Sequence, residues 1–252
     1  MKLSKDKKII TFKHPANNAF LAPIVPAAKA LPDWYKQASI QQGGDALHDS
    51  QHIKGSMPFF DAMTQGYIIP LWSDVHVSTG FDAETGHIVP SFTWLDSAET
   101  GRDSSDVIFS HTPMQTKGMP GVDEGKIMGG RAFKFANPWI MQTPKGYSTL
   151  FVTPLNGGNP HFQMVSAIVA TDSYFINILL PFFWTGPEDF EGVIPRGTPL
   201  IQVIPFKRDD FQHEIKPLTD EDCQLAHSIR ARLAQSFTGA YKQTWRKIVR
   251  ST

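Results

Sequence analysis

Short segments rich in β-branched and aromatic residues, separated by Gly and Pro, occupy most of the chain between residues 67 and 206. The 252 residues include 19 Gly and 19 Pro, and the Pro residues are spread between the segments rather than gathered in one linker. Because Pro lacks a backbone N–H and Gly favours turns, this spacing leaves room for short strands and excludes long helices. We expect strands at Tyr67–Leu71, Asp74–Ser78, His87–Leu95, Val107–His111, Arg131–Ala136, Ser148–Thr153, Met164–Ala170, Phe175–Pro181 and Leu200–Phe206.

The hydrophobic pattern within these segments indicates the fold class. Apolar residues alternate at Phe133 and Phe135, which predicts a strand with one buried face. The runs Ile176–Leu180 and Leu200–Ile204 alternate little, so we expect both to lie deep between two layers. Many short strands without long helices between them are typical of all-β domains. The sequence therefore predicts a mainly β fold with a β-clip or jelly-roll-like sandwich core.

Helices are expected only near the ends of the chain. Ala27–Gln37 predicts a short helix in which Pro32 lies in the first turn or breaks it. We therefore expect an N-terminal extension with a short helix over 1–60, a β core over 61–210 and a C-terminal helical segment over 211–252.

The C-terminal segment has clear helix signals. Thr219 precedes three acids, which suits a capping hydroxyl and the positive end of a helix dipole. Apolar residues then recur every four positions from Leu225 to Trp245, and Gly239 is the natural place for a break. The pattern predicts helices at about 220–237 and 240–250.

Positive charge is concentrated at both ends, although the formal net charge is zero. Residues 1–13 carry five Lys against one Asp, residues 223–252 carry six Lys and Arg and no acid, and the remainder is acidic. A zero net charge argues against general attraction to nucleic acid, and local phosphate contact stays possible but is not indicated. Solubilising tails, or pairing of the basic ends with acidic neighbours, are the two interpretations.

Cysteine content and hydropathy limit the class of protein further. Cys223 is the single cysteine, which excludes an internal disulfide framework and a thiolate-rich zinc site. The longest apolar run, Tyr174–Trp184, is too short to span a bilayer, and the Lys-rich N-terminus lacks the apolar stretch of a signal peptide. We expect an intracellular protein with no membrane partner.

The histidines form no recognisable metal motif. His48 with His52, and Asp74 with His76, are spaced to share a helix face and a strand face, but neither pair has a third ligand at a diagnostic spacing. The sequence therefore predicts no metal and no cofactor.

Candidate site residues come from the polar positions next to the predicted strands. His111 ends a predicted strand, where an imidazole can act as acid or base. Asn156, Asn159, Thr171 and Asp172 are the polar residues expected near a ligand pocket, with Asp172 also a catalytic candidate. The same residue types serve turns and cores, and Pro144-Lys-Gly146 is typical of a type II turn with Pro at its second position.

Five short motifs carry a family resemblance: Leu31-Pro-Asp-Trp-Tyr35, Thr143-Pro-Lys-Gly-Tyr147, Pro154-Leu-Asn156, Ile168-Val-Ala-Thr-Asp172 and Ile194-Pro-Arg-Gly-Thr-Pro199. In these motifs the chain resembles a family of uncharacterised phage and bacterial proteins, which has no established activity. The resemblance extends over most of the chain.

More remotely, the order of these segments is similar to the dUTPase and dCTP deaminase superfamily, whose fold is the β-clip. Pro144-Lys-Gly146, Ile168-Val-Ala170 and Arg196-Gly-Thr-Pro-Leu-Ile-Gln202 stand where that superfamily has a turn, a hairpin and its closing strand. The resemblance implies nucleotide chemistry, from which the residues depart.

The departures concern the groups that bind and attack the nucleotide. Ala170 stands where the superfamily has the Asp that orients water, and Leu155-Asn156 stand where it has the Arg-Ser pair that holds phosphate. No Gly-rich arm that would close over a triphosphate is recognisable. Asp172 would replace the missing Asp if the hairpin slips by two residues, which keeps the same strand face. Without phosphate ligands, nucleotide hydrolysis is disfavoured.

Two functions stay open, of which the sequence favours the first. The first is a non-enzymatic, virus-encoded β protein that acts by assembly, as a structural or decoration component of a virion, in the cytoplasm of an infected bacterial host or in the particle. Its partners would be further copies of the chain or other virion proteins, met through the basic termini. The second is a small-molecule or nucleotide-binding enzyme of β-clip type that uses Asp172, Asn156 and His111. A cupin-like metal oxygenase shares the architecture, but its ligand spacing is missing.

Overall fold

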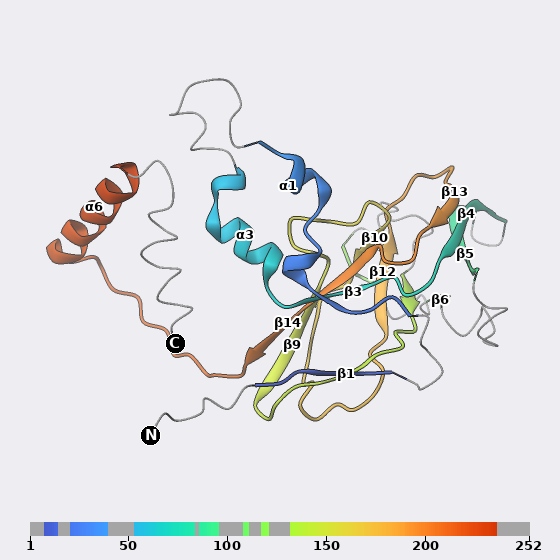
Figure 1. The fold of residues 1–252 in the computed structure, drawn as a ribbon, viewed down its shortest axis with the longest axis horizontal. Coiled ribbons are helices and arrows are strands. Elements are labelled where there is room, and N and C mark those ends of the chain that lie inside the picture. Colours follow the sequence, from blue (N-terminus) through green and yellow to red (C-terminus); the bar gives the residue numbers. More distant parts are fainter. Residues whose placement is uncertain are drawn as a thin grey trace. The chain divides into compact units, whose positions relative to one another are not determined.

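The computed structural model describes residues 8–14, 21–39, 53–83, 86–95, 108–110, 117–120 and 132–235. They belong to two compact units (Figure 1). The first unit takes its residues from 1–30 and 65–208, and the second from 31–64 and 209–252.

The first unit consists of antiparallel sheets, so the fold is mainly β with a sandwich-like core, as the sequence predicts. Each sheet joins strands that are far apart in the chain, and all the pairings are antiparallel. The five-stranded sheet has the order β11 (Ala167–Val169), β9 (Tyr147–Val152), β14 (Pro199–Lys207), β3 (Tyr67–Pro70), β2 (Val25–Pro26). The four-stranded sheet has the order β10 (Phe162–Met164), β12 (Leu180–Trp184), β7 (Phe133–Phe135), β6 (Ile108–Ser110). The three-stranded sheet has the order β13 (Glu191–Ile194), β4 (Val75–Asp82), β5 (His87–Trp94), while β1 (Thr11–Lys13) pairs with β8 (Ile140–Gln142).

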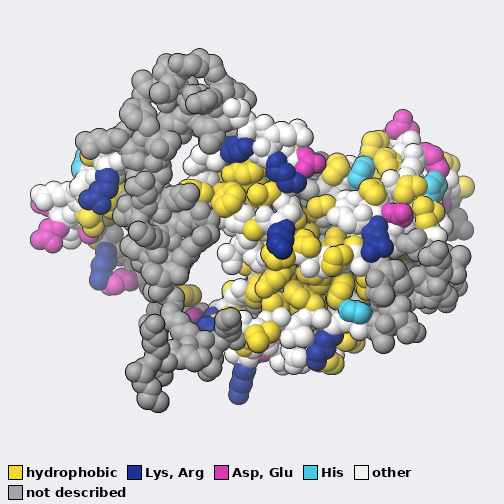
Figure 2. Space-filling model, viewed as in Figure 1, with side chains coloured by type: hydrophobic (Ala, Val, Ile, Leu, Met, Phe, Trp, Pro, Cys, Tyr) yellow, Lys and Arg dark blue, Asp and Glu magenta, His cyan; other side chains and the backbone are white. Residues whose placement is uncertain are grey.

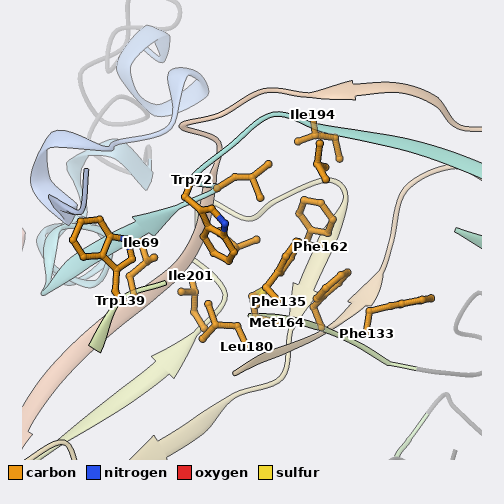
Figure 3. Close-up of a cluster of buried hydrophobic side chains, with 14 of the residues drawn as sticks. Ile69, Trp72, Phe133, Phe135, Trp139, Phe162, Met164, Leu180, Ile194 and Ile201 are labelled. Carbon is orange, nitrogen blue, oxygen red and sulfur yellow. The ribbon is translucent and has the colours of Figure 1, made fainter. Parts of the chain in front are cut away.

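Aromatic rings fill the core of this unit (Figure 3). Phe135 is fully buried, and its ring stacks on Phe182 with 4.2 Å between ring centroids. The rings of Phe162 and Trp72 meet it edge-on at 5.2 and 5.7 Å. Because such pairs add stability beyond the area they bury, Phe135 connects three strands of one sheet with the link between β3 and β4.

The two apolar runs that were predicted to be deeply buried differ in their burial. Leu200–Ile204 lies in the central strand β14, and its first four residues are buried, which confirms the prediction. Ile176–Leu180 was expected to be equally deep, but only Leu180 is buried while Ile176 and Leu179 are exposed. The predicted strand at Phe175–Pro181 is wrong as well, since β12 begins at Leu180. In this segment the Asn177 amide donates to the carbonyl of Asn137 at 2.9 Å.

The observed strands differ from the predicted ones at other places as well. The expected strand Met164–Ala170 is divided into β10 and β11, which pair with different sheets. The strands β1, β2, β8 and β13 were not predicted, because each is four residues or shorter and carries little periodicity.

The two Pro-x-Gly sequences, Pro144-Lys-Gly146 and Pro195-Arg-Gly197, both form tight turns. Gly146 and Gly197 adopt φ of 85° and 88°, as the type II turn requires of its third residue. The closing bonds run from the Tyr147 N–H to the Pro144 carbonyl and from the Thr198 N–H to the Pro195 carbonyl. Pro is therefore the first residue of each turn, not the second as predicted.

The second unit contains the helices α1 (Asp33–Gln37), α3 (Met57–Thr64) and α6 (Asp220–Gln235), with a 3-10 turn at Ile53–Gly55. The helix predicted at Ala27–Gln37 is interrupted: Ala27–Lys29 forms a 3-10 turn in the first unit, and Pro32 precedes α1. Pro breaks the helix because it lacks an N–H and clashes with the preceding turn.

Two aromatic contacts and one cap stabilise these helices. Tyr35 of α1 is buried, with its ring 6.3 Å from that of Phe59 and 6.0 Å from that of Phe60 in α3. α3 itself was not predicted. At the start of α6 the Thr219 hydroxyl accepts the Asp222 N–H and the Asp222 carboxylate accepts the Thr219 N–H, which confirms the predicted cap. The predicted helix at 240–250 lies outside the described residues.

None of the helices described is long and apolar enough to cross a membrane.

Replacing Phe135 by Ala should lower the free energy of unfolding by about 3–5 kcal/mol, because a cavity would remain among rings from several strands. Urea denaturation measures this change. Phe81→Ala is the matched control in the same unit, since its side chain is 73% exposed, and should change stability by about 0.5 kcal/mol or less. Equal losses in the two variants would contradict the central role of Phe135.

Candidate functional site

Asp172, the main catalytic candidate, lies in the turn after β11, and both oxygens of its carboxylate accept hydrogen bonds. Its carboxylate forms a bidentate ion pair with Arg208, which directly follows β14, and it also accepts the Gly146 N–H at 2.8 Å and the Ser173 hydroxyl at 3.2 Å. The side chain is only 6% exposed. These bonds connect the turn after β11 to the end of β14 and to the turn before β9. We call this set of contacts of Asp172 the clasp.

The electrostatics of the clasp follow from these bonds. The Arg208 guanidinium, followed by the Gly146 N–H, holds the pKa of Asp172 well below the usual range of a carboxyl. The ion pair in turn raises the pKa of Arg208. A general base works best with a pKa near the operating pH and a free acceptor. The geometry of Asp172 therefore suits a structural ion pair better than proton transfer.

Thr171 belongs to a buried chain of hydroxyls. Its Oγ1 lies 2.8 Å from Oγ1 of Thr143 and 2.8 Å from Oγ1 of Thr149, and all three side chains are buried. The Thr143 N–H also donates to the Thr171 carbonyl. Each hydroxyl is thereby satisfied inside the protein, as buried polar groups require.

Asn159 fastens the start of β10. Its Oδ1 accepts the N–H groups of His161 at 2.8 Å and Phe162 at 3.1 Å, and its Nδ2 donates to the Pro199 carbonyl at 2.9 Å. Asn side chains commonly close turns in this way. This residue thus joins β10 to the first residue of β14.

Asn156 lies in the turn between β9 and β10 with a φ of 57°. The N–H groups of Gly157 and Gly158 both donate to the Pro154 carbonyl. Asn tolerates the left-handed region better than most residues, so the turn itself accounts for its identity.

The predicted ligand residues are not gathered in one place. Thr171 and Asp172 contact the beginning of β9 and the turn before it, whereas Asn156 follows the end of β9. A six-residue strand is about 20 Å long. The ligand-binding role of these residues stays a prediction, and His111 lies outside the described residues.

Gln202 is a polar residue that sequence reasoning missed. It is buried in β14, where its Oε1 accepts the Leu155 N–H at 2.8 Å and its Nε2 donates to the Gln65 carbonyl at 2.7 Å. A single amide inside the apolar run Leu200–Ile204 was the available signal. It joins the turn after β9 to the residues that lead into β3.

His161 was also missed. Its ring stacks on Trp184, with 5.6 Å between centroids, and lies 5.0 Å from the ring of Phe190. Burial lowers the pKa of His161, which favours the neutral form of the imidazole. Its Nδ1 and the Trp184 Nε1 are buried without a hydrogen-bond partner among the described residues. A Cβ on Gly186 would lie 2.2 Å from the Trp184 indole, so the backbone at Gly186 packs closely against this ring.

The histidines of the predicted pairs have other partners or lie outside the described residues. His76 Nε2 lies 2.8 Å from Glu191 Oε1 across β4 and β13. Asp74 accepts the Arg196 N–H instead of sharing a site with His76. Within the described ranges no three His, Cys, Asp or Glu residues come together as a metal site would need. His48 and His52 fall outside those ranges.

Comparison with protein-family models, curated proteins and solved structures finds no match. The resemblances to the phage and bacterial family and to the dUTPase and dCTP deaminase superfamily therefore stay predictions.

Asp172→Asn should make the stability of the fold less dependent on pH between pH 7 and pH 2. A carboxyl whose pKa is lower in the folded state stabilises the fold above its ordinary pKa, near 3.8, and this contribution is lost as the pH falls through that value toward the folded pKa. The variant should therefore be less stable than the wild type at pH 7, and the difference should shrink toward pH 2.

Thermal unfolding at pH 7, 5, 3 and 2 measures this dependence. Asp33→Asn is the control, because Asp33 pairs with Lys36 on the exposed side of α1 and its side chain is 80% exposed. A constant difference between Asp172→Asn and the wild type at every pH would contradict the prediction.

Proposed function

We propose that this chain is a non-enzymatic, virus-encoded protein that acts by assembly, as a structural or decoration component of a particle. It would reside in the cytoplasm of an infected bacterial host and then in the virion. Its partners would be further copies of itself or other virion proteins.

The observation that carries the proposal is a set of exposed apolar side chains on the edge strand β11 of the five-stranded sheet and on the segment that leads from it to β12. We call it the β11 edge surface. Ile168 is 66% exposed on the terminal strand β11, and the segment that follows exposes four further large apolar side chains. Its residues are Ile168, Tyr174, Phe175, Ile176 and Leu179. Clustered exposed apolar residues mark interaction sites more often than isolated ones do.

This edge lacks the usual protection against pairing. Natural edge strands carry Lys, Pro or a bulge that discourages association. The opposite edge strand of the same sheet, β2, contains Pro26, whereas β11 has neither charge nor Pro. Between Met164 and Trp184 the single charged residue is Asp172, which Arg208 neutralises. The edge is therefore able to accept another strand.

A basic residue of β1 borders this surface. The Lys13 ammonium lies 4.8 Å from the ring centroid of Phe175 and donates to Gln142 Oε1. A partner with apolar side chains and nearby acids would complement both features. Figure 2 shows Lys and Arg beside exposed hydrophobic side chains on the face drawn.

The contacts of three candidate site residues, the catalytic candidate Asp172 and the ligand-binding candidates Asn159 and Thr171, also support assembly over catalysis. Asp172 is engaged by Arg208, and Asn159 and Thr171 are engaged by backbone and hydroxyl groups. None of these side chains has the free acceptor that orienting a water would need.

The proposal predicts that the chain is part of purified particles. Mass spectrometry of particles from the encoding virus should detect the chain at a constant ratio to the main shell protein after repeated density-gradient purification. Incubation of the purified protein with dUTP and dCTP should leave both nucleotides unchanged. Particles that lack the chain, or hydrolysis of either nucleotide, would overturn the proposal.

The β11 edge surface predicts that Ile168→Lys reduces assembly without affecting the fold. Light scattering coupled to gel filtration should give a wild-type mass above the 28.1 kDa of one chain and a smaller mass for the variant. A Lys on the edge places a charge where the partner strand would bury it. The thermal unfolding midpoint should stay close to that of the wild type, since the side chain is exposed.

Val193→Lys is the matched control. Val193 is 49% exposed on β13, the edge strand of another sheet, where Glu191 already supplies a charge. This variant should keep the wild-type mass. An equal loss in both variants, or a monomeric wild type, would count against the β11 edge surface.

A further inference from the structure

Helix α6 is largely exposed over residues 220–233, where Ala226 and Ile229 are half-buried. No residue of its first fourteen, Asp220–Leu233, is buried, and Leu225 and Leu233 are 60% and 42% exposed. The segment before it, residues 209–219, is exposed too. An isolated helix of this length is only marginally stable in water, because most helical stability in proteins comes from packing an apolar face. The helix therefore needs a partner.

The face that would take the partner is narrow. Leu225, Ile229 and Leu233 are four residues apart, which places them on one side of the helix within about 80°. Glu221 and Arg232 lie on the same flank of this stripe, since they are eleven residues apart and three full turns take 10.8 residues.

The charges of α6 are arranged by sign along its axis. The first turn holds Asp220, Glu221 and Asp222, while Arg230 and Arg232 lie near the other end. In Figure 2 acidic side chains lie at one end of this helix and basic side chains toward the other. A parallel pair of such helices would place acid beside acid. An antiparallel pair would place each acidic first turn beside the basic end of its partner, and it would also align the helix dipoles favourably.

We propose that α6 pairs in antiparallel orientation with α6 of a second copy of this chain, through the stripe Leu225–Ile229–Leu233. The inference rests on the proposed function in that it names one partner for assembly, but it uses a surface separate from the β11 edge surface. The two surfaces together would let copies associate in more than one direction. Helix pairing alone would join copies two by two.

The separation of the surfaces allows a direct test in the Ile168→Lys background of the full chain. With the β11 edge surface disabled, the chain should form a dimer that dissociates on dilution. Adding Glu221→Lys, or separately Arg232→Glu, turns each attraction across the pair into a repulsion. Each change should raise the dimer dissociation constant about tenfold, as measured by analytical ultracentrifugation.

Combining Glu221→Lys with Arg232→Glu provides the decisive measurement. The two residues are about 16 Å apart within one helix, too far to pair there, so recovery of the dimer by the double variant can come only from contacts between copies. We expect recovery short of the original affinity, because the swapped charges oppose the helix dipole.

Three results would overturn the inference. They are a monomeric Ile168→Lys variant, single reversals that leave dimerisation unchanged, and a double variant as weak as the single ones. Cover of the stripe by the chain's own C-terminal residues would produce the first result. A wild type that still assembles and is still found in particles would then leave the proposed function intact.

Discussion

The fold of the first unit depends on the packing of aromatic rings around Phe135. Strands β7, β10 and β11 are each three residues long, so ladder hydrogen bonds alone hold them weakly. The Phe135 ring contacts Phe162, Phe182 and Trp72, which come from two neighbouring strands and from the link between two other sheets. These contacts fix the relative positions of short strands that have little independent stability.

Short strands also leave many turns, and buried or clasped polar side chains hold those turns in place. Asp172 with Arg208 closes the turn after β11, Asn159 anchors β10 to β14, and Gln202 links the turn after β9 to the approach to β3. Polar residues next to strand ends are expected both in ligand sites and in such clasps. Here Asp172, Asn159 and Gln202 all have partners within the protein, so the turns themselves account for these polar residues.

Apolar side chains that the core does not use lie on the surface. The β11 edge surface and the stripe on α6 belong to different units, and both are exposed. A free sheet edge offers backbone groups for pairing, whereas a charged amphipathic helix selects the orientation of its partner. In a protein that assembles, a sheet edge can contribute affinity between copies, and a charged helix can contribute specificity for one orientation.

The sequence by itself determined the mainly β fold, the depth of Leu200–Ile204 and the Thr219 cap of α6, because these follow from local residue types and spacing. Only the tertiary structure decided that Ile176–Leu180 is largely exposed, although its apolar character equals that of the buried run. It also decided that Asp172 pairs with Arg208, which is 36 residues away. Periodicity predicts which face of a segment is apolar, but burial and charge pairing depend on which distant segments pack against it, and neither spacing nor composition specifies that.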